Sequence, residues 1–304
     1  MNNSDVCILI PTLNEGATIG NVIKDFKAEG FSEILVIDGH SVDKTREIAE
    51  AEGVRVVLQS GKGKGQALIQ AFELIESPYI VLVDGDGTEL ARDAHTLLAP
   101  LFEGRAEHVV GNRLVRFEKG AFTKLNLLGN HLINRLFDLA YGVQQKDILS
   151  GYRAFTRESI RELELNKLGF EIETEISVEC ILKNQRVLEF PISYLPRSEK
   201  GVTKLNPLKD GFRIGVTIYR LAKMHNPIFY FGIIGSLFIL AGIISGSFVV
   251  WQWFQGITRI PMTVLTSLLL IFGLQMFIFG MLSDLIVALH KQTIRLIQAQ
   301  YKSK

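Results

Sequence analysis

Short apolar runs alternate with segments of helical periodicity over the first part of the chain. The runs are closed by polar or turn residues and are typical of buried strands: 6–10, 33–37, 54–58 and 79–83. Between them, apolar residues recur at helical spacing and predict helices over 18–28, 44–52 and 65–75. Alternating strands and helices predict an α/β domain with a mostly parallel, Rossmann-like sheet and right-handed crossovers.

A further segment, 122–141, has the pattern of an amphipathic helix. Its apolar residues recur at helical spacing: Phe122, Leu125, Leu128, Leu132, Ile133, Leu136 and Leu139. Such a helix either lies in a membrane interface or packs against the sheet. The pattern alone leaves both interpretations open.

Two long uncharged stretches follow the α/β pattern. The chain has 304 residues and 65 Lys, Arg, Asp and Glu, yet only Arg259 and Asp284 fall within 226–289. At about 1.5 Å per residue, the stretch 228–254 can cross a bilayer core of roughly 30 Å, and 262–283 is the second uncharged run. We therefore expect two transmembrane helices, through which copies of the chain could form a homo-oligomer.

The distribution of cations predicts the orientation in the membrane. Five cations precede the first span and four follow the second, whereas the loop between them contains only Arg259. The positive-inside rule then places the soluble domain and the tail in the cytoplasm. The expected organisation is a soluble α/β domain over 1–213, a juxtamembrane segment over 214–226, a two-helix membrane domain over 227–290 and a basic tail over 291–304.

Composition excludes several classes of protein. The net charge of +1 gives no indication of a nucleic-acid partner. The contrast between the charged first part and the uncharged spans excludes a wholly soluble protein and a disordered chain. Two cysteines without ligand spacing exclude a disulfide scaffold.

Polar clusters follow three of the predicted strands. They are Pro11-Thr12-Leu13-Asn14-Glu15, Asp38-Gly39-His40-Ser41 and Asp84-Gly85-Asp86. Ligands of parallel sheets bind at the carboxyl ends of the strands, so these clusters predict one site. Two carboxylates at the end of a buried strand repel each other, and a hard divalent cation that also binds a diphosphate would hold both. Asp84 and Asp86 are therefore the predicted metal ligands.

The run Gly61-Lys62-Gly63-Lys64-Gly65 is neither a dinucleotide fingerprint nor a P-loop. It follows the third strand, its spacing is GxGxG, and no Ser or Thr follows a terminal Gly-Lys pair. A glycine-rich turn that opens a helix could hold a phosphate through its backbone N–H groups, with Lys64 as an added charge. A flexible, solvated loop is the alternative.

With these residues in place, the chain resembles a family-2 glycosyltransferase with the GT-A fold over roughly 6–213. Four later segments are similar to the polyprenyl-phosphate and dolichyl-phosphate hexosyltransferases: Gly111-Asn112-Arg113, Asp147-Ile148-Leu149-Ser150-Gly151-Tyr152-Arg153, Phe170-Glu171-Ile172-Glu173, and Thr203-Lys204-Leu205 with Asp210-Gly211. In that group C-terminal membrane helices tether the catalytic domain. The resemblance implies transfer of a sugar from a nucleotide sugar to a lipid phosphate on the cytoplasmic face.

The resemblance also implies roles for matching residues. The nucleotide sugar would be bound by Pro11, Leu13, Asn14, Glu15, Asp38, Lys64, Asp84 and Gly85. Asp84 and Asp86 would hold Mg²⁺ or Mn²⁺. The lipid phosphate would be bound by Arg113, Ser150, Arg153, Arg197 and Lys204, because cations must offset the charge of two phosphate groups. Asp86, Arg113 and Arg153 are the residues expected to be catalytic.

Two departures from the family pattern bear on which nucleotide sugar is the expected donor. Gly39 stands where many members have a second acid, and Thr88 stands where mannosyl members have Gln. Both favour UDP-glucose or another UDP-sugar, with a GDP-mannose-dependent mannosyltransferase as one alternative and a non-catalytic membrane scaffold or sensor as another. A lipid phosphate is already mostly dianionic near neutral pH, so we expect inverting transfer without a general base.

Overall fold

The computed structural model describes residues 3–197 and 207–302. The chain forms two compact units, one made of residues 1–138 and 143–218, the other of 139–142 and 219–304. The division falls within helix α8 (Pro207–His225), a few residues after the domain boundary expected from the sequence. The two units are described separately.

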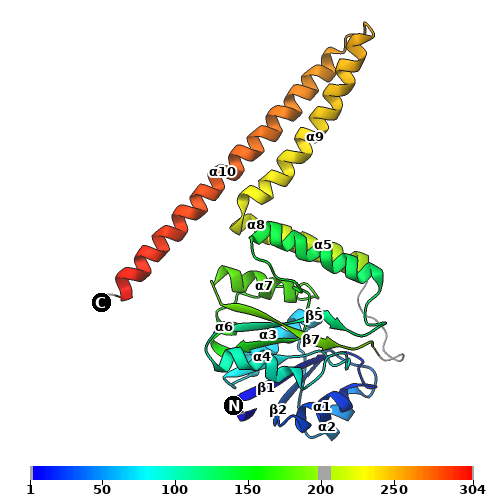
Figure 1. The fold of residues 1–304 in the computed structure, drawn as a ribbon, viewed down its shortest axis with the longest axis vertical. Helices are drawn as coiled ribbons and strands as arrows, with labels where there is room; N and C mark the ends of the chain where they lie inside the picture. Colours follow the sequence, from blue (N-terminus) through cyan, green and yellow to red (C-terminus); the bar gives the residue numbers. More distant parts are fainter. Residues whose placement is uncertain (1–2, 198–206, 303–304) are drawn as a thin grey trace. The chain divides into compact units, whose positions relative to one another are not determined.

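The first unit is built on a seven-stranded sheet (Figure 1). Its strands are β1 (Val6–Thr12), β2 (Glu33–Asp38), β3 (Arg55–Leu58), β4 (Tyr79–Leu82), β5 (His108–Phe117), β6 (Arg153–Thr156) and β7 (Val187–Tyr194). The spatial order is β3-β2-β1-β4-β6-β5-β7, and β6 is antiparallel to both of its neighbours. The prediction of a mostly parallel sheet is confirmed, and the four predicted strands correspond to β1, β2, β3 and β4.

Helices cover both faces of the sheet (Figure 1). They are α1 (Ile19–Ala28), α2 (Thr45–Ala51), α3 (Lys64–Leu74), α4 (Asp93–Phe102), α6 (Arg157–Arg161) and α7 (Ile172–Leu182), and a short 3-10 helix spans Asn3–Asp5. Alternate residues of β1 point to opposite faces: Ile8 joins the core beneath α1 and α4, whereas Leu9 joins the core beneath α3 and α7. The strand β1 is therefore buried on both sides, as its uninterrupted apolar run predicts.

Helix α5 (Lys124–Tyr141) confirms the helical pattern over 122–141. Phe137 and Ala140 on one face are buried, whereas four leucines form an exposed stripe: Leu125, Leu128, Leu132 and Leu139. Leu136 packs near Gly215 of α8. The helix thus has a protein-facing side and an apolar side that no described residue covers.

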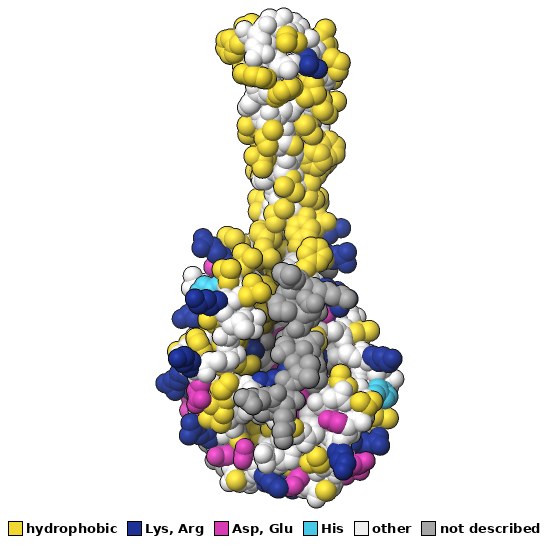
Figure 2. Space-filling view, turned by 90° about the vertical axis from the view of Figure 1, so that its right-hand side faces the viewer, with side chains coloured by type: hydrophobic (Ala, Val, Ile, Leu, Met, Phe, Trp, Pro, Cys, Tyr) yellow, Lys and Arg dark blue, Asp and Glu magenta, His cyan; other side chains and the backbone are white. Residues whose placement is uncertain are grey.

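The second unit is dominated by α9 (Pro227–Phe254) and α10 (Ile260–Lys302). Residues 227–254 and 260–290 are long and apolar enough to cross a membrane, and only 11% of each apolar window is buried within the protein. Figure 2 shows hydrophobic side chains over this pair, whereas charged side chains gather on the α/β unit. The second helix continues well beyond the uncharged run that predicted it.

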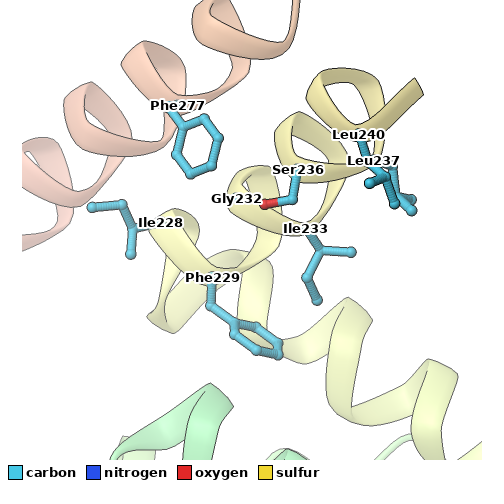
Figure 3. Close-up of a pocket in the computed structure, with 8 residues that line it drawn as sticks. All are labelled: Ile228, Phe229, Gly232, Ile233, Ser236, Leu237, Leu240 and Phe277. Atoms are coloured by element: carbon cyan, nitrogen blue, oxygen red, sulfur yellow. The ribbon is translucent and has the colours of Figure 1, made fainter. Parts of the chain in front are cut away.

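Small residues allow α9 and α10 to approach closely. A Cβ on Gly235 would lie 2.8 Å from the carbonyl oxygen of Gly273, and Ser245 Oγ lies 2.8 Å from Thr266 Oγ1. Beside this contact is an apolar groove of about 450 Å³ (Figure 3). Its lining is Ile228, Phe229, Gly232, Ile233, Ser236, Leu237, Leu240 and Phe277.

Candidate active site

The loops after β1 and β2 interlock at the carboxyl edge of the sheet. The Ser41 backbone N–H and hydroxyl donate to the two oxygens of Asp38, at 2.9 and 2.5 Å. Asn14 has a φ of 52°, a left-handed conformation that asparagine tolerates, and its N–H donates to Ser41 Oγ at 2.8 Å. The buried Asp38 carboxylate is therefore held in one orientation beside the first loop.

The other predicted donor residues lie at the same edge. Pro11 is the next-to-last residue of β1 and pairs with Ile37, while Leu13 is exposed in the loop that follows. Gly85 allows the turn after β4 to pack closely against Thr12 at the end of β1, because a Cβ there would lie 2.9 Å from the Thr12 methyl group. The nucleotide-binding cluster expected from the sequence is thus brought together spatially.

Asp84 belongs to a charge cluster in which its own side chain is 32% exposed, whereas those of Lys64 and Glu173 are 12% and 6% exposed. The Lys64 ammonium lies 2.6 Å from Asp84 Oδ1 and 2.7 Å from Glu173 Oε1 on α7. Burial alone would raise the pKa of Asp84, but three nearby cations outweigh it and hold the pKa below its usual value: Lys64, Arg113 and Arg197. Gly151 is required here, since a Cβ would lie 2.8 Å from the Asp84 carboxylate.

Asp86 is fixed by a separate set of contacts. The Thr88 hydroxyl and N–H donate to Asp86 Oδ1 at 2.7 and 3.1 Å. The other oxygen, Oδ2, accepts from Arg197 Nη2 at 2.8 Å. Arg197 Nη2 is also 3.2 Å from Glu15 Oε1, so this arginine links the loop after β1 to the Asp84-x-Asp86 motif.

The donor set fits a hard divalent cation that shares its coordination with a ligand. Asp84 and Asp86 supply oxygen donors, the type that Mg²⁺ and Mn²⁺ prefer. Within residues 3–197 and 207–302 no group of three or more His, Cys, Asp or Glu is arranged to hold a metal ion alone. Diphosphate oxygens would therefore have to complete such a site.

Glu89 is a third carboxyl beside this pair, and no motif in the sequence pointed to it. Burial, together with the charges of Asp84 and Asp86, raises its pKa well above the usual value. Glu89 Oε2 accepts from the Asp84 N–H at 3.2 Å, so the side chain supports the turn that carries the motif.

Arg113 lies within β5, at the irregularity that follows the Asn112–Pro191 pair with β7, next to the charge cluster. Its Nε and Nη2 donate to the two oxygens of the fully buried Asp147 at 2.9 and 2.8 Å. The guanidinium carbon lies 5.4 Å from the Tyr194 ring centroid and 5.9 Å from that of Phe122. Asp147 thus fixes Arg113 as a rigid cation within electrostatic range of Asp84.

Arg153 and Ser150, which the resemblance assigns to the lipid phosphate, lie in the interior of the α/β unit. Both are fully buried. Arg153 donates to the carbonyls of Ser150 and Ile148 at 2.8 and 2.7 Å and to Ser177 Oγ at 3.0 Å. Through these contacts Arg153 holds the turn before β6, and its guanidinium donors point to groups of the protein interior. Lys204, the remaining predicted phosphate ligand, lies outside the described residues.

The glycine run also differs from the expectation of a backbone phosphate cradle. The Gly65 N–H donates to the Leu168 carbonyl at 3.1 Å, so it is already occupied. A Cβ on Gly63 or Gly65 would lie 2.2 or 2.0 Å from the carbonyl oxygens of Leu168 and Lys167. The glycines therefore allow two backbones to touch, and the Lys64 side chain reaches the charge cluster.

Comparison with known proteins defines the class. The family model "Glycosyl transferase family 2" matches residues 7–164, and the chain belongs to this family. It is a glycosyltransferase with the GT-A fold expected from the sequence, which confirms the resemblance.

Three proteins of known name are similar to this chain in sequence. The chain is 46% identical over 295 residues to Glycosyltransferase AglJ of Haloferax volcanii, covering 96% of this chain and 97% of that protein. It is 31% identical to the Dolichyl-phosphate hexose transferase of the same organism, covering 71% and 93%. It is 28% identical to the Dolichol-phosphate mannosyltransferase of Pyrococcus furiosus, covering 81% and 71%.

Solved structures agree on the fold. Glucosyl-3-phosphoglycerate synthase from Mycobacterium tuberculosis, crystallised with Mn²⁺, UDP-glucose and phosphoglyceric acid, superposes with a TM-score of 0.56. The identity is 22%, and the match covers 72% of this chain and 78% of that one. At this identity the likeness concerns the fold.

Proposed function

We propose that the protein transfers a hexose from a nucleotide sugar to dolichyl or polyprenyl phosphate at the cytoplasmic face of a membrane. The observation that carries this proposal is the convergence of cations on the Asp84-x-Asp86 motif. Lys64 contacts Asp84, Arg197 contacts Asp86, and Arg113 lies within electrostatic range of Asp84. A site that joins two phosphate-containing substrates needs this concentration of positive charge.

The donor half of the site is formed by the interlocked loops after β1 and β2. Asp38 and Asn14 present fixed hydrogen-bonding groups at the edge where the base and ribose would bind. Asp84 and Asp86 would hold Mg²⁺ or Mn²⁺ against the diphosphate. The Mn²⁺ and UDP-glucose of the mycobacterial synthase, a protein of the same fold, support this assignment.

The acceptor half is formed around Arg113. A guanidinium held by Asp147 and flanked by Phe122 and Tyr194 can orient a phosphate without having to be ordered first. The names of the dolichyl-phosphate relatives support a lipid phosphate as the acceptor. Arg197 is the second cation that would contact it after the donor complex has replaced the contact with Asp86.

The chemistry requires no general base from the chain. A phosphate monoester has a second pKa of about 6 and is mostly dianionic at neutral pH. Arg113 would orient this oxygen nucleophile, Lys64 would stabilise the departing diphosphate, and a bound divalent ion would supply further charge stabilisation there. Direct displacement inverts the anomeric centre, so an α-linked donor gives a β-linked product.

Two features support the membrane assignment: the candidate membrane spans and the exposed leucine stripe of α5. Residues 227–254 and 260–290 are the candidate spans, with cations before the first and after the second. The exposed leucine stripe of α5 favours the membrane-interface alternative for that helix, because four large apolar side chains in one row are costly in water.

The donor that we propose is UDP-glucose or another UDP-sugar. Thr88, which stands where mannosyl members have Gln, holds Asp86 and is 2% exposed. A GDP-mannose donor is the alternative, supported by the 28% identity to the Pyrococcus furiosus mannosyltransferase.

A product assay tests the proposal. Purified full-length protein is incubated with Mg²⁺ or Mn²⁺, dolichyl phosphate and a panel of UDP- and GDP-sugars, and the lipid is analysed by mass spectrometry. We expect a hexosyl-phosphodolichol from a UDP-sugar and no product from Asp86→Asn. A mannosyl lipid made from GDP-mannose alone would select the alternative, and the absence of any lipid-linked product would refute the acceptor class.

A further inference from the structure

Glu173 is buried beside the donor site, although it is neither a predicted metal ligand nor a predicted nucleotide ligand. It lies in the first turn of α7, and its side chain is 6% exposed. Its Oε1 is 2.7 Å from the Lys64 ammonium, which is also 2.6 Å from Asp84. Lys64 is thus shared between a carboxylate of the metal motif and one from a helix far along the chain.

The backbone on both sides of this contact is locked. Gly63 and Gly65 pack directly on the carbonyl groups of Leu168 and Lys167, and the Gly65 N–H donates to Leu168. At the other end, Ser177 Oγ donates to the Glu173 carbonyl at 3.1 Å. The start of α3 and the start of α7 therefore hold Lys64 and Glu173 at a fixed separation.

The electrostatics of Lys64 are consistent with this arrangement. Two carboxylates flank the ammonium group, Asp84 at 2.6 Å and Glu173 at 2.7 Å, and the lysine side chain is only 12% exposed. Their negative charges favour the ammonium group at this position.

Binding of the donor changes what Lys64 can contact. A divalent ion bound to Asp84 would take the place of the ammonium as the partner of that carboxylate. Without a second anchor, the long lysine side chain would be repelled by the ion and would move away. Glu173, 2.7 Å from the ammonium, would be that anchor and would keep the ammonium next to Asp84.

We propose that Glu173 is a positioning residue that acts through Lys64 to hold its ammonium group on the diphosphate of the bound donor. The inference rests on the proposed function, since it assumes a nucleoside diphosphate at this edge of the sheet. Simple electrostatics gives the opposite expectation: removal of a nearby negative charge should strengthen binding of an anion.

Calorimetric titration with UDP and with GDP, each in Mn²⁺, tests the proposal on the full-length protein in detergent. Glu173→Gln should weaken nucleotide binding about tenfold, the size of a lost charge-assisted contact. Lys64→Gln should weaken it at least as much. In the Lys64→Gln background, Glu173→Gln should cause no further loss, because its effect passes through Lys64.

Glu171→Gln, two residues away at the start of the same helix, is the matched control and should bind like the wild type. Nucleotide affinity that is unchanged or tighter in Glu173→Gln overturns the proposal. An equal further loss on the Lys64→Gln background also overturns it, because it would indicate a general structural effect. If the wild type binds neither nucleotide, the proposed function itself is wrong.

Discussion

Replacement of Arg153 distinguishes a structural role from a catalytic one. The side chain is fully buried, and its guanidinium donates to the carbonyls of Ser150 and Ile148 and to the hydroxyl of Ser177. Arg153→Ala leaves all three groups without this partner and opens a cavity between β6 and α7. We predict that the variant loses stability first and activity only as a consequence.

The magnitude follows from the contacts. A buried acceptor that loses its donor costs about 1–3 kcal/mol, and two carbonyls are affected. Burial lowers the pKa of Arg153, because a buried charge loses its hydration, and alanine removes this cost, so part of the loss is recovered. The net decrease in the free energy of unfolding should be about 3–4 kcal/mol, which lowers the melting temperature by about 6–15 °C in a unit of this size.

Scanning calorimetry of the full-length protein measures the effect, with the exposed Arg161→Ala as the control. At a temperature where Arg153→Ala is still folded, nucleotide binding should be close to that of the wild type. Normal stability combined with lost turnover of lipid phosphate would refute the reasoning, because it would show that the side chain acts on the acceptor.

Three further predictions concern separate parts of the molecule. Thr88→Val should require roughly tenfold more Mn²⁺ for half-maximal activity, because Asp86 loses a hydroxyl donor, whereas Thr88→Ser should behave like the wild type. Burial and the charge of Arg153 hold the pKa of His108 well below its usual value of 6.5, so His108 is neutral in the folded protein. The free energy of unfolding should therefore fall as the pH drops below 6.5, by up to about 1.4 kcal/mol per pH unit. Thermal melts from pH 5 to 7 should show that His108→Gln flattens this slope. Leu128→Glu with Leu132→Glu on the exposed face of α5 should lower the rate with dolichyl phosphate in liposomes several-fold and leave the rate with a water-soluble short-chain phosphate unchanged; equal losses with both would contradict an interfacial role.

The first four strands and the edge cluster could be predicted because their signals are local. An apolar run that ends at Asp38 or Asp84 marks a strand end, and parallel topology brings such ends together. The exposed side of α5 could be read from spacing, but whether the sheet or a membrane covers it could not, since both surfaces are apolar.

The roles of Arg153 and Lys64 depend on contacts that no local pattern encodes. An arginine beside a turn has the same sequence signature whether it faces the site or the interior, and only the position of β6 between β4 and β5 decides it. The partner of Lys64 is on α7, so its ion pair with Glu173 appears only after the chain folds. The glycines of 61–65 likewise have a packing role that is visible only once Leu168 is in place.

The stereochemistry of the product tests the central claim most directly. The purified protein is incubated with its α-linked nucleotide sugar and dolichyl phosphate, and the anomeric configuration of the lipid-linked sugar is determined by NMR. Direct attack by the phosphate oxygen, oriented by Arg113 beside the Asp84-x-Asp86 motif, predicts a β-linked product. An α-linked product would contradict the single-displacement account.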